Sequence, residues 1–237
     1  MSAAIVLLAA GSGTRVGATT NKVLLPLTGG DQPGEAGDTC LGRCLRTVLT
    51  LPDVSRIVLV ARAGDEATVA AIAEALLGDR EAAMVLGGST RHDSEQAALG
   101  VLRPAIDSGE VDVVAIHDAA RPLATAALFA TTLAEARQRG GAVPVAPLGR
   151  LLTRSLEPAE PGRRLVGVQT PQSFRAAPLL AAYDAAARDG AAGTDTAATL
   201  ERYAAHLEIA AVPSTALNVK VTFADDLAAV ARLSPPA

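Results

Sequence analysis

The chain has 237 residues and a formal net charge of -4, with 49% hydrophobic, 19% charged and 2% aromatic residues. Its length allows roughly 70–75% of the unfolded surface to be buried, and its composition excludes a disordered chain, a collagen-like chain and a disulfide scaffold. The negative charge argues against a duplex nucleic-acid partner, and the scarcity of aromatic side chains leaves no stacking platform for single strands.

Short apolar runs alternate with longer helical stretches rich in Ala and Leu. The predicted strands cover residues 4–10, 56–61, 83–86, 111–117, 142–145 and 207–212. The predicted helices cover residues 41–51, 66–77, 91–102, 125–139, 178–188, 194–205 and 225–233. Strands separated by helices of about 10–15 residues indicate a mostly parallel sheet with helices on both faces. We therefore expect an α/β fold with a doubly wound, Rossmann-like sheet.

Two segments interrupt this alternation. Residues 28–38 are rich in Gly, Pro and acidic side chains and predict a surface loop. Residues 147–168 have no clean period, and a stretch of this length without secondary structure is long for a simple connection. We expect a functional arm at about residues 147–168 that projects from the sheet. Because no linker is long enough to divide the chain, residues 1–237 are expected to form a single domain.

The cysteines and the N-terminus bear on where the protein works. Cys40 and Cys44 have no further cysteine nearby and the three histidines are scattered, which argues against a zinc site and favours a reducing compartment. The apolar run of residues 3–10 has no basic segment before it and is too short to span a bilayer. We expect a soluble, cytoplasmic protein with no membrane partner.

Lysine is rare in this chain. Of the 21 basic residues only Lys22 and Lys220 are lysine, and the others are arginine. An ammonium is a compact, strongly hydrated point charge, whereas a guanidinium is a planar fork, so these two positions are candidates for sites that need a point charge. Chance is the alternative explanation.

The first predicted strand leads into a glycine-rich turn that contains Gly11 and Gly13 and is followed by Arg15, Gly17 and Lys22. Such a turn lets backbone N–H groups approach an anion closely. Gly17 comes one position too late for the dinucleotide pattern G-x-G-x-x-G, and the Gly-Lys-Ser/Thr of a Walker A loop is absent. Two alternatives remain: a phosphate-handling loop with Arg15 and Lys22 as its cations, and a plain strand–helix connection.

The strand that ends at His117 is followed by Asp118, Arg121 and Pro122. Ligands of open α/β sheets bind beyond the carboxyl ends of the strands, and Mg²⁺ takes one or two carboxylates plus substrate phosphates. Asp118 is therefore a candidate for holding Mg²⁺, and it is also a candidate cap for a helix from Pro122 onward. No acid or nucleophile is evident as a partner of His117, which we expect to be structural.

Three further motifs are weak individually. The stretch 87–94 (GGSTRHDS) is a turn before a predicted helix, where Ser89 or Thr90 could cap the helix and the backbone could read the edge of a base. The stretches 168–174 (VQTPQSF) and 218–222 (NVKVT), of which the latter holds the second lysine, each predict a turn.

Together and in this order, the five motifs resemble those of the nucleotidyltransferases that make CDP-alcohols, and most closely the 2-C-methyl-D-erythritol 4-phosphate cytidylyltransferase family. The motifs are Gly-x-Gly-x-Arg followed by Lys, Gly-Gly-Ser, His-Asp-Ala-Ala-Arg-Pro, Gln-Thr-Pro-Gln and Asn-x-Lys-Val-Thr. The resemblance runs over essentially the whole chain, from Ala9 to Asp226, and the motifs are specific jointly but not individually. The resemblance implies Mg²⁺-dependent transfer of the cytidylyl group of CTP to a small polyol phosphate, with 2-C-methyl-D-erythritol 4-phosphate as the favoured acceptor. The products would be the CDP-alcohol and pyrophosphate, in isoprenoid precursor biosynthesis, and the enzyme would be a homodimer formed through the arm.

The resemblance also implies a role for each matched residue. The catalytic residues would be Arg15 and Lys22, which would stabilise charge on the triphosphate, and Lys220, which would lie near the acceptor. Asp118 would hold Mg²⁺. Residues on the CTP side would be Ala9, Ala10, Gly11, Gly13, Gly88, Ser89 and Ser94. Residues near the acceptor phosphate would be Arg121, Thr170, Thr194 and, on the arm, Arg163.

The arm departs from the family pattern. Where the family has Asp-Thr-x-Lys soon after a Pro, with a Thr that helps to bind the sugar phosphate of the dimer partner, this chain has Arg150-Leu151-Leu152-Thr153. For the arginine of the family's arm, Arg163 or Arg164 falls beside the expected position. Three explanations stay open: Arg150 or Arg154 substitutes, the acceptor is another polyol phosphate such as ribitol 5-phosphate, or activity is reduced.

Two other functional classes compete with a cytidylyltransferase. A nucleotide-binding regulator without catalysis would have little need for Arg15, Lys22, Asp118 and Lys220 together. A nicotinamide-dependent dehydrogenase is disfavoured by the late Gly17 and by the lack of an acidic residue at the end of a second strand. Since two polyanions must meet in cytidylyl transfer, the hypothesis requires the three cations and Asp118 to surround one cavity.

Overall fold

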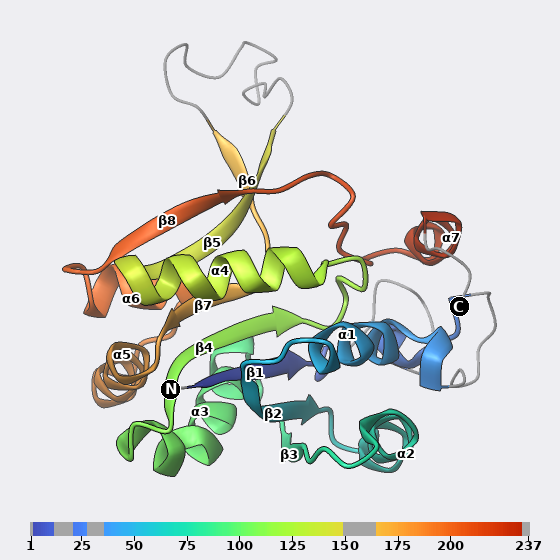
Figure 1. Ribbon diagram of the computed structural model, residues 1–237, viewed down its shortest axis with the longest axis horizontal. Coiled ribbons are helices and arrows are strands. Elements are labelled where there is room, and N and C mark those ends of the chain that lie inside the picture. The colour runs from blue at the N-terminus through green and yellow to red at the C-terminus, as the bar shows by residue number, and fades with distance from the viewer. Residues whose placement is uncertain (1, 12–20, 28–35, 149–164, 234–237) are drawn as a thin grey trace.

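The computed structural model describes residues 2–11, 21–27, 36–148 and 165–233 and places eight strands in one sheet (Figure 1). The strands are β1 (Ser2–Leu8), β2 (Val54–Ala61), β3 (Ala83–Leu86), β4 (Val111–Asp118), β5 (Gly140–Pro147), β6 (Val166–Val168), β7 (Gln172–Arg175) and β8 (Glu208–Pro213). The helices are α1 (Cys40–Leu49), α2 (Glu66–Leu77), α3 (Arg91–Asp107), α4 (Ala126–Arg139), α5 (Ala176–Arg188), α6 (Thr196–Tyr203) and α7 (Ala224–Leu233). Two short 3₁₀ turns are η2 (Lys22–Leu24) and η3 (Ala36–Asp38).

The sheet is mixed and mostly parallel. Its strand order is β3-β2-β1-β4-β7-β5-β6, and β8 pairs with β5 away from this path. The pairs among β1 to β4 are parallel, as is the pair of β5 with β8. β7 is antiparallel to both of its neighbours, β4 and β5, and β6 is antiparallel to β5. The α/β fold class predicted from the sequence is confirmed.

Helices cover both faces of the sheet. On one face, apolar side chains of α1, α2, α4 and α7 share a core with side chains of β1, β2 and β4, and this core includes the fully buried Phe129 and Leu45. On the other face, α3, α5 and α6 pack in a second core that includes Phe174 and Tyr183. This two-sided burial explains why the parallel strands have near-continuous apolar sequences.

The predicted elements agree with the structure except in two places. The six predicted strands are present, with ends that move by up to two residues, and the helix predicted at 91–102 continues to Asp107. The prediction of a turn at 168–174 was right only for residues 169–171, which connect β6 to β7, because residues 172–175 form β7 in the middle of the sheet. Gln172 and Ser173 are buried there, and hydrogen bonds to Asp195 and Thr132 satisfy their side chains. β6 was also missed, since it lies inside the stretch that has no clean period.

The base of the expected arm is built by β5 and β6, which pair through Val145, Ala146 and Pro147 and extend away from the rest of the sheet (Figure 1). Residues 149–164, which make up most of the expected arm, lie outside the described residues. In the described part of the chain, no helix combines the length and apolar character that a membrane crossing requires. Cys40 and Cys44 are buried free thiols in α1.

Candidate active site

A cavity of about 480 Å³ lies at the carboxyl ends of the parallel strands β1, β3 and β4. This is the edge at which open α/β sheets bind ligands. Six separate parts of the chain contribute to its wall. The lining residues are Leu8, Ala10, Gly11, Lys22, Val23, Arg62, Gly88, Ser89, Thr90, Arg91, Ser94, Asp118, Ala120 and Lys220.

Lys22 is held at the cavity by its neighbour Asn21. The Asn21 side chain is fully buried and its amide donates to the carbonyl oxygen of Ala9 at 2.5 Å and to Asp65 Oδ2 at 3.0 Å. Its side-chain oxygen accepts from the backbone N–H of Val23 and caps η2. These contacts fix the start of η2 against the end of β1, so Lys22 enters the cavity from a rigid base.

The turn that follows β3 forms a second wall. At Gly87 a Cβ atom would lie 2.4 Å from Ala10 Cβ and 2.9 Å from Ser94 Oγ, so only glycine allows this close approach to the first turn. Ser94 Oγ accepts from the Gly88 N–H at 3.1 Å and donates to the Thr90 carbonyl oxygen at 2.9 Å. Thr90 caps α3 in a capping box with Asp93, which confirms one of the two predicted caps.

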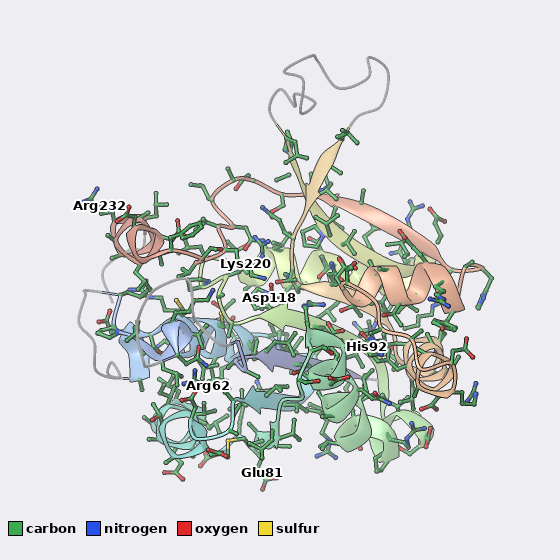
Figure 2. All side chains as sticks on the ribbon, turned by 180° about the vertical axis from the view of Figure 1, so that it is seen from behind. Arg62, Glu81, His92, Asp118, Lys220 and Arg232 are labelled. Atoms are coloured by element: carbon green, nitrogen blue, oxygen red, sulfur yellow. The ribbon has the colours of Figure 1, made fainter. Side chains whose placement is uncertain are left out.

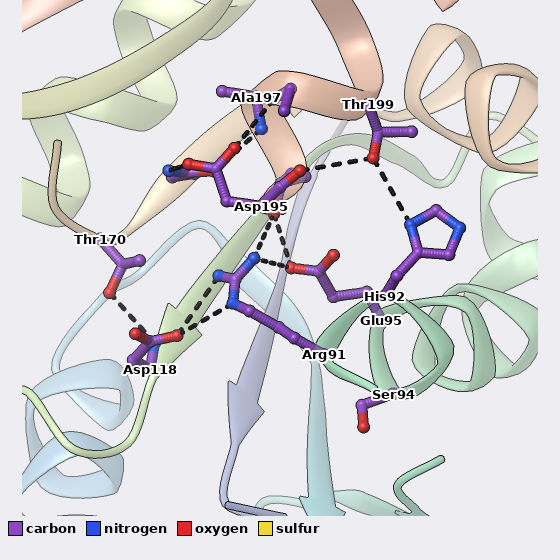
Figure 3. Close-up of polar contacts among 12 residues, drawn as sticks. Arg91, His92, Ser94, Glu95, Asp118, Thr170, Asp195, Ala197 and Thr199 are labelled. Carbon is purple, nitrogen blue, oxygen red and sulfur yellow. Dashed lines mark hydrogen bonds and ion pairs between the residues drawn. The ribbon is translucent and has the colours of Figure 1, made fainter. Parts of the chain in front are cut away.

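Asp118, the last residue of β4, faces the cavity between two cations (Figures 2 and 3). Lys220 Nζ lies 2.6 Å from Asp118 Oδ2, and Arg91 Nη2 lies 3.3 Å from Asp118 Oδ1. Burial would raise the pKa of Asp118, but the nearby Arg91 and Lys220 charges outweigh burial and hold that pKa well below its usual range. The carboxylate is therefore ionised and its charge is matched.

The backbone around Asp118 is fixed by Thr170 and by the loop that carries Lys220. The Asp118 N–H donates to Thr170 Oγ1 at 3.0 Å. The Val221 N–H donates to the Ala120 carbonyl oxygen at 2.8 Å, and Asn218 Nδ2 donates to the Thr170 carbonyl oxygen at 3.0 Å. The three segments are thus tied to one another, which explains how Lys220 reaches Asp118 across the chain.

His117 is a structural residue, as the sequence indicated. Its ring is fully buried, with Nε2 3.1 Å from the Arg121 carbonyl oxygen and Nδ1 3.0 Å from Thr170 Oγ1. Burial lowers the pKa of His117 to about 4, so the ring is neutral at pH 7. The idea that Asp118 caps a helix from Pro122 is not borne out, because the next helix, α4, begins at Ala126 and is capped by Thr125.

The structure brings most of the predicted site residues together. The predicted residues that line the cavity are Ala10, Gly11, Lys22, Gly88, Ser89, Ser94, Asp118 and Lys220. Arg15, Gly13 and Arg163 lie outside the described residues, as do Arg150 and Arg154. The roles of these residues stay predictions.

Four predicted residues do not line the cavity. Ala9 is fully buried, and its backbone joins β2 and Asn21. Arg121 Nη1 donates to the Asn218 carbonyl oxygen at 2.6 Å, and Thr170 supports Asp118. Thr194 is exposed just before α6. These positions do not test a role in acceptor binding, which stays a prediction.

Sequence reasoning missed two arginines of the cavity. Arg62 follows β2 and pairs with Asp65 at 2.9 Å, and Arg91 begins α3. In a chain with so many arginines neither position is distinctive by composition. Their position in the sequence could have identified them. Arg62 directly follows β2 and Arg91 comes shortly after β3, at the sheet edge where ligands bind.

The donor set bears on the predicted Mg²⁺ site. In the described part of the chain, no group of three or more His, Cys, Asp or Glu side chains could hold a metal ion. Asp118 supplies one ionised carboxylate at the cavity wall. Mg²⁺ commonly takes only one or two protein carboxylates and completes its shell with phosphate oxygens and water, so this donor set fits Mg²⁺ when phosphates are present.

Comparisons with known proteins agree with the site. A family model described as 2-C-methyl-D-erythritol 4-phosphate cytidylyltransferase matches residues 3–233. The bifunctional enzyme IspD/IspF of Clavibacter michiganensis is 38% identical over 94% of this chain, which spans about half (52%) of that relative's length. The 2-C-methyl-D-erythritol 4-phosphate cytidylyltransferase of Cereibacter sphaeroides is 36% identical, with 98% of this chain and 97% of the relative covered.

A solved structure is similar as well. The crystal structure of the 2-C-methyl-D-erythritol 4-phosphate cytidylyltransferase from Thermus thermophilus matches with a TM-score of 0.69 and 27% identity, and covers 98% of this chain and 100% of that one. The full-length family match, the relatives and the shared fold agree with the five motifs. The chain therefore belongs to the 2-C-methyl-D-erythritol 4-phosphate cytidylyltransferase family.

Proposed function

We propose that this protein transfers the cytidylyl group of CTP to 2-C-methyl-D-erythritol 4-phosphate, with release of pyrophosphate, in isoprenoid precursor biosynthesis. The observation that carries the proposal is the convergence of Lys22, Asp118 and Lys220 on one cavity with the Gly88–Ser94 turn. Three distant motifs meet there, in a chain whose family is defined by this reaction. A regulator or a dehydrogenase would not require this arrangement.

The reaction depends on neutralising the negative charges of CTP and of the acceptor phosphate more than on proton transfer. A phosphate oxygen of the acceptor attacks the α-phosphorus of CTP, the bond from that phosphorus to the bridging oxygen breaks, and pyrophosphate leaves. The phosphate monoester is largely ionised at pH 7, so no general base is required. Lys22, Arg62 and Lys220 supply positive charge from fixed elements, which lowers the repulsion between the two polyanions and stabilises the pentacoordinate phosphorus. Arg15 is proposed to act with them.

We propose that CTP binds against the turn that follows β1 and the turn that follows β3. Ala10, Gly11, Gly88 and Ser89 offer backbone groups that side chains do not block. Ser94 would act there by fixing Gly88 in place. The acceptor side is assigned to Lys220, Arg121, Thr170, Thr194 and the arm, with Arg163 as the proposed arm residue.

Mg²⁺ belongs to the proposal as a cofactor held by Asp118 together with substrate phosphates. When bound, it would screen the negative charges of the triphosphate and the acceptor. Lys220 contacts one carboxylate oxygen of Asp118 and Arg91 contacts the other, and Asp118 would hold the ion through a lone pair that these contacts leave open. Asp118 contributes an ionised oxygen at a fixed point of the cavity wall.

The quaternary arrangement and location also belong to the proposal. At the base of the arm, Leu165, Val166 and Val168 expose 42–51% of their surface, and such a row of apolar side chains favours a protein interface. We propose a homodimer formed through the arm at about residues 147–168, on a single domain that covers 1–237. The free thiols are compatible with a cytoplasmic location.

A pyrophosphate-release assay tests the function. The purified protein is incubated with CTP, Mg²⁺ and methylerythritol phosphate, and in a second arm with ribitol 5-phosphate, the alternative acceptor left open by the arm sequence. Release with the first acceptor supports the proposal, and release only with the second assigns a different polyol phosphate. Binding of CTP without release with either acceptor would favour a nucleotide-binding homologue and overturn the proposal.

A further inference from the structure

A buried carboxylate that the reaction does not use lies directly behind the cavity. Glu95 is only 1% exposed, although it lies in the first turns of α3, whose start borders the cavity. Arg91 Nη1 forms an ion pair with Glu95 Oε1, four residues further along the same helix face. Glu95 is therefore one side chain away from Asp118.

Arg91 is shared between two carboxylates (Figure 3). Its Nε and Nη2 atoms approach Asp118 Oδ1 at 3.4 and 3.3 Å, both long for a charged pair, while Nη1 contacts Glu95. Nη1 also lies 3.4 Å from Thr196 Oγ1. The guanidinium is thus drawn toward Glu95 and held back from a close bidentate pair with Asp118.

Glu95 is itself fixed by two other helices. Tyr183 Oη from α5 donates to Glu95 Oε2, and Thr196 Oγ1 from α6 donates to Oε1 at 2.7 Å. The Tyr183 ring is stacked on His92, with centroids 4.6 Å apart. Three donors therefore converge on one carboxylate, and the packing of α3, α5 and α6 determines the position of Glu95. Burial raises the pKa of Glu95, while the Arg91 charge and the hydrogen bonds from Tyr183 and Thr196 oppose that rise.

We propose that Glu95 is a positioning residue for the active site: it holds the Arg91 guanidinium at the cavity wall and keeps Arg91 from closing onto Asp118. Without the Glu95 charge, Arg91 would form a closer pair with Asp118 and compete for the oxygen that the reaction needs. Glu95 itself does not line the cavity, so it acts through Arg91. This inference rests on the proposed cytidylyltransferase function.

The first test is Glu95→Gln, which keeps the shape and an acceptor oxygen but removes the charge. We expect kcat to fall by about tenfold to a hundredfold, as a small misplacement of a site group does, while KM for CTP stays within about threefold. Thr132→Val is the control, because it removes a buried hydroxyl that bonds Ser173 and contacts neither Arg91 nor Glu95. This control should lose stability without a change in kcat.

A double-mutant cycle then separates positioning from a general effect. Arg91→Lys keeps the charge but cannot bridge two carboxylates, so it should lower kcat by a similar factor. If Glu95 acts through Arg91, the double variant Arg91→Lys/Glu95→Gln should have nearly the same kcat as Arg91→Lys alone. Multiplicative losses, or a Glu95→Gln variant with kcat within twofold of the wild type, would overturn the inference.

A crystal structure of the Glu95→Gln variant gives a readout that does not depend on activity. We expect the Arg91 guanidinium to leave Thr196 and pair more closely with Asp118. An unmoved guanidinium would overturn the positioning role even if catalysis is altered. Failure of the wild type to release pyrophosphate from CTP with either acceptor would instead overturn the proposed function, and the crystal structure would still decide the role of Glu95.

Discussion

Lys220 Nζ lies 2.6 Å from Oδ2 of Asp118, although 102 residues separate the two along the chain. Asp118 ends β4, whereas Lys220 lies in the loop before α7. The Asp118 side chain is 11% exposed and the Lys220 side chain 43%, so the lysine reaches from solvent to a largely buried carboxylate. This contact joins the His-Asp-Ala-Ala-Arg-Pro motif to the Asn-x-Lys-Val-Thr motif, which lie far apart in the sequence.

Lys220→Met should remove this ammonium while keeping most of the apolar stem. We expect kcat/KM to fall by about 10²–10³, the scale of losing one preorganised charge-stabilising group. Steady-state kinetics with CTP and methylerythritol phosphate measures this loss, and Lys220→Arg is the control that keeps a positive charge. An unchanged kcat/KM in Lys220→Met would remove Lys220 from the reaction.

Lys22→Ala should lower turnover far more than CTP affinity. Lys22 enters the cavity from η2, and its charge is worth most when negative charge builds up around the α-phosphorus. We expect kcat to fall by about 10²–10³. Calorimetric titration with CTP should show less than a tenfold change in Kd. A variant that loses affinity and keeps its turnover would assign Lys22 to ground-state binding instead.

Thr170→Val should weaken the support of Asp118. The change replaces a buried hydroxyl by a methyl group and leaves the Asp118 N–H and His117 Nδ1 without their partner. Leaving such a buried group unpaired costs about 1–3 kcal/mol of unfolding free energy. Urea unfolding measures this loss, and Thr170→Ser, which keeps the hydroxyl, is the matched control. Equal stability of the valine and serine variants would contradict the assigned contact.

Cys40 should make the folded protein less stable at alkaline pH. Burial raises the pKa of the Cys40 thiol from 9.0 to about 12, so the folded state retains a proton that the unfolded state loses. The contribution of the Cys40 thiol to the free energy of unfolding is fully present below pH 9. It decreases by about 1.4 kcal/mol per pH unit as the pH rises toward 12. Cys40→Ser does not titrate there. Urea unfolding should give a shallower pH dependence for the variant than for the wild type, and parallel curves would contradict the prediction.

The exposed strand β6 should form part of a dimer interface. Val166→Glu places a charge among the exposed apolar side chains at the base of the arm, and it should shift a micromolar sample from dimer to monomer in sedimentation velocity. Met84→Glu on β3, at the other end of the strand order and also exposed, is the control that should leave the dimer intact. A wild-type monomer at this concentration would refute the proposed dimer.

The parallel strands of the sheet could be predicted because runs of apolar residues, each followed by a helix, are enough to identify them. The buried runs in β1, β2 and β4 are continuous, and each is followed by a helix. β7 could not be predicted in this way, since its buried Gln172 and Ser173 are polar. Their partners are Asp195, which caps α6, and Thr132 of α4, and only the assembled fold supplies them.

The same distinction applies to the site. Lys22, Asp118 and Lys220 stand out through their residue types and motifs, and the cavity contains all three. Arg91 and Glu95 form an i, i+4 pair that in sequence resembles an ordinary solvent-exposed pair on a helix. Their importance arises because α5 and α6 cover Glu95, which is a property of helix packing that a local pattern does not contain.

The antiparallel course of β6 and β7 along β5 has an evolutionary consequence. Together the three strands form one long hairpin: β6 pairs with the end of β5, and β7 pairs with its beginning. The Gln169 N–H donates to the Pro144 carbonyl oxygen at 2.8 Å, which anchors the returning strand just before Thr170. Insertions or deletions between β5 and β6 can therefore accumulate during divergence without displacing Thr170 or the Asp118 backbone that Thr170 holds.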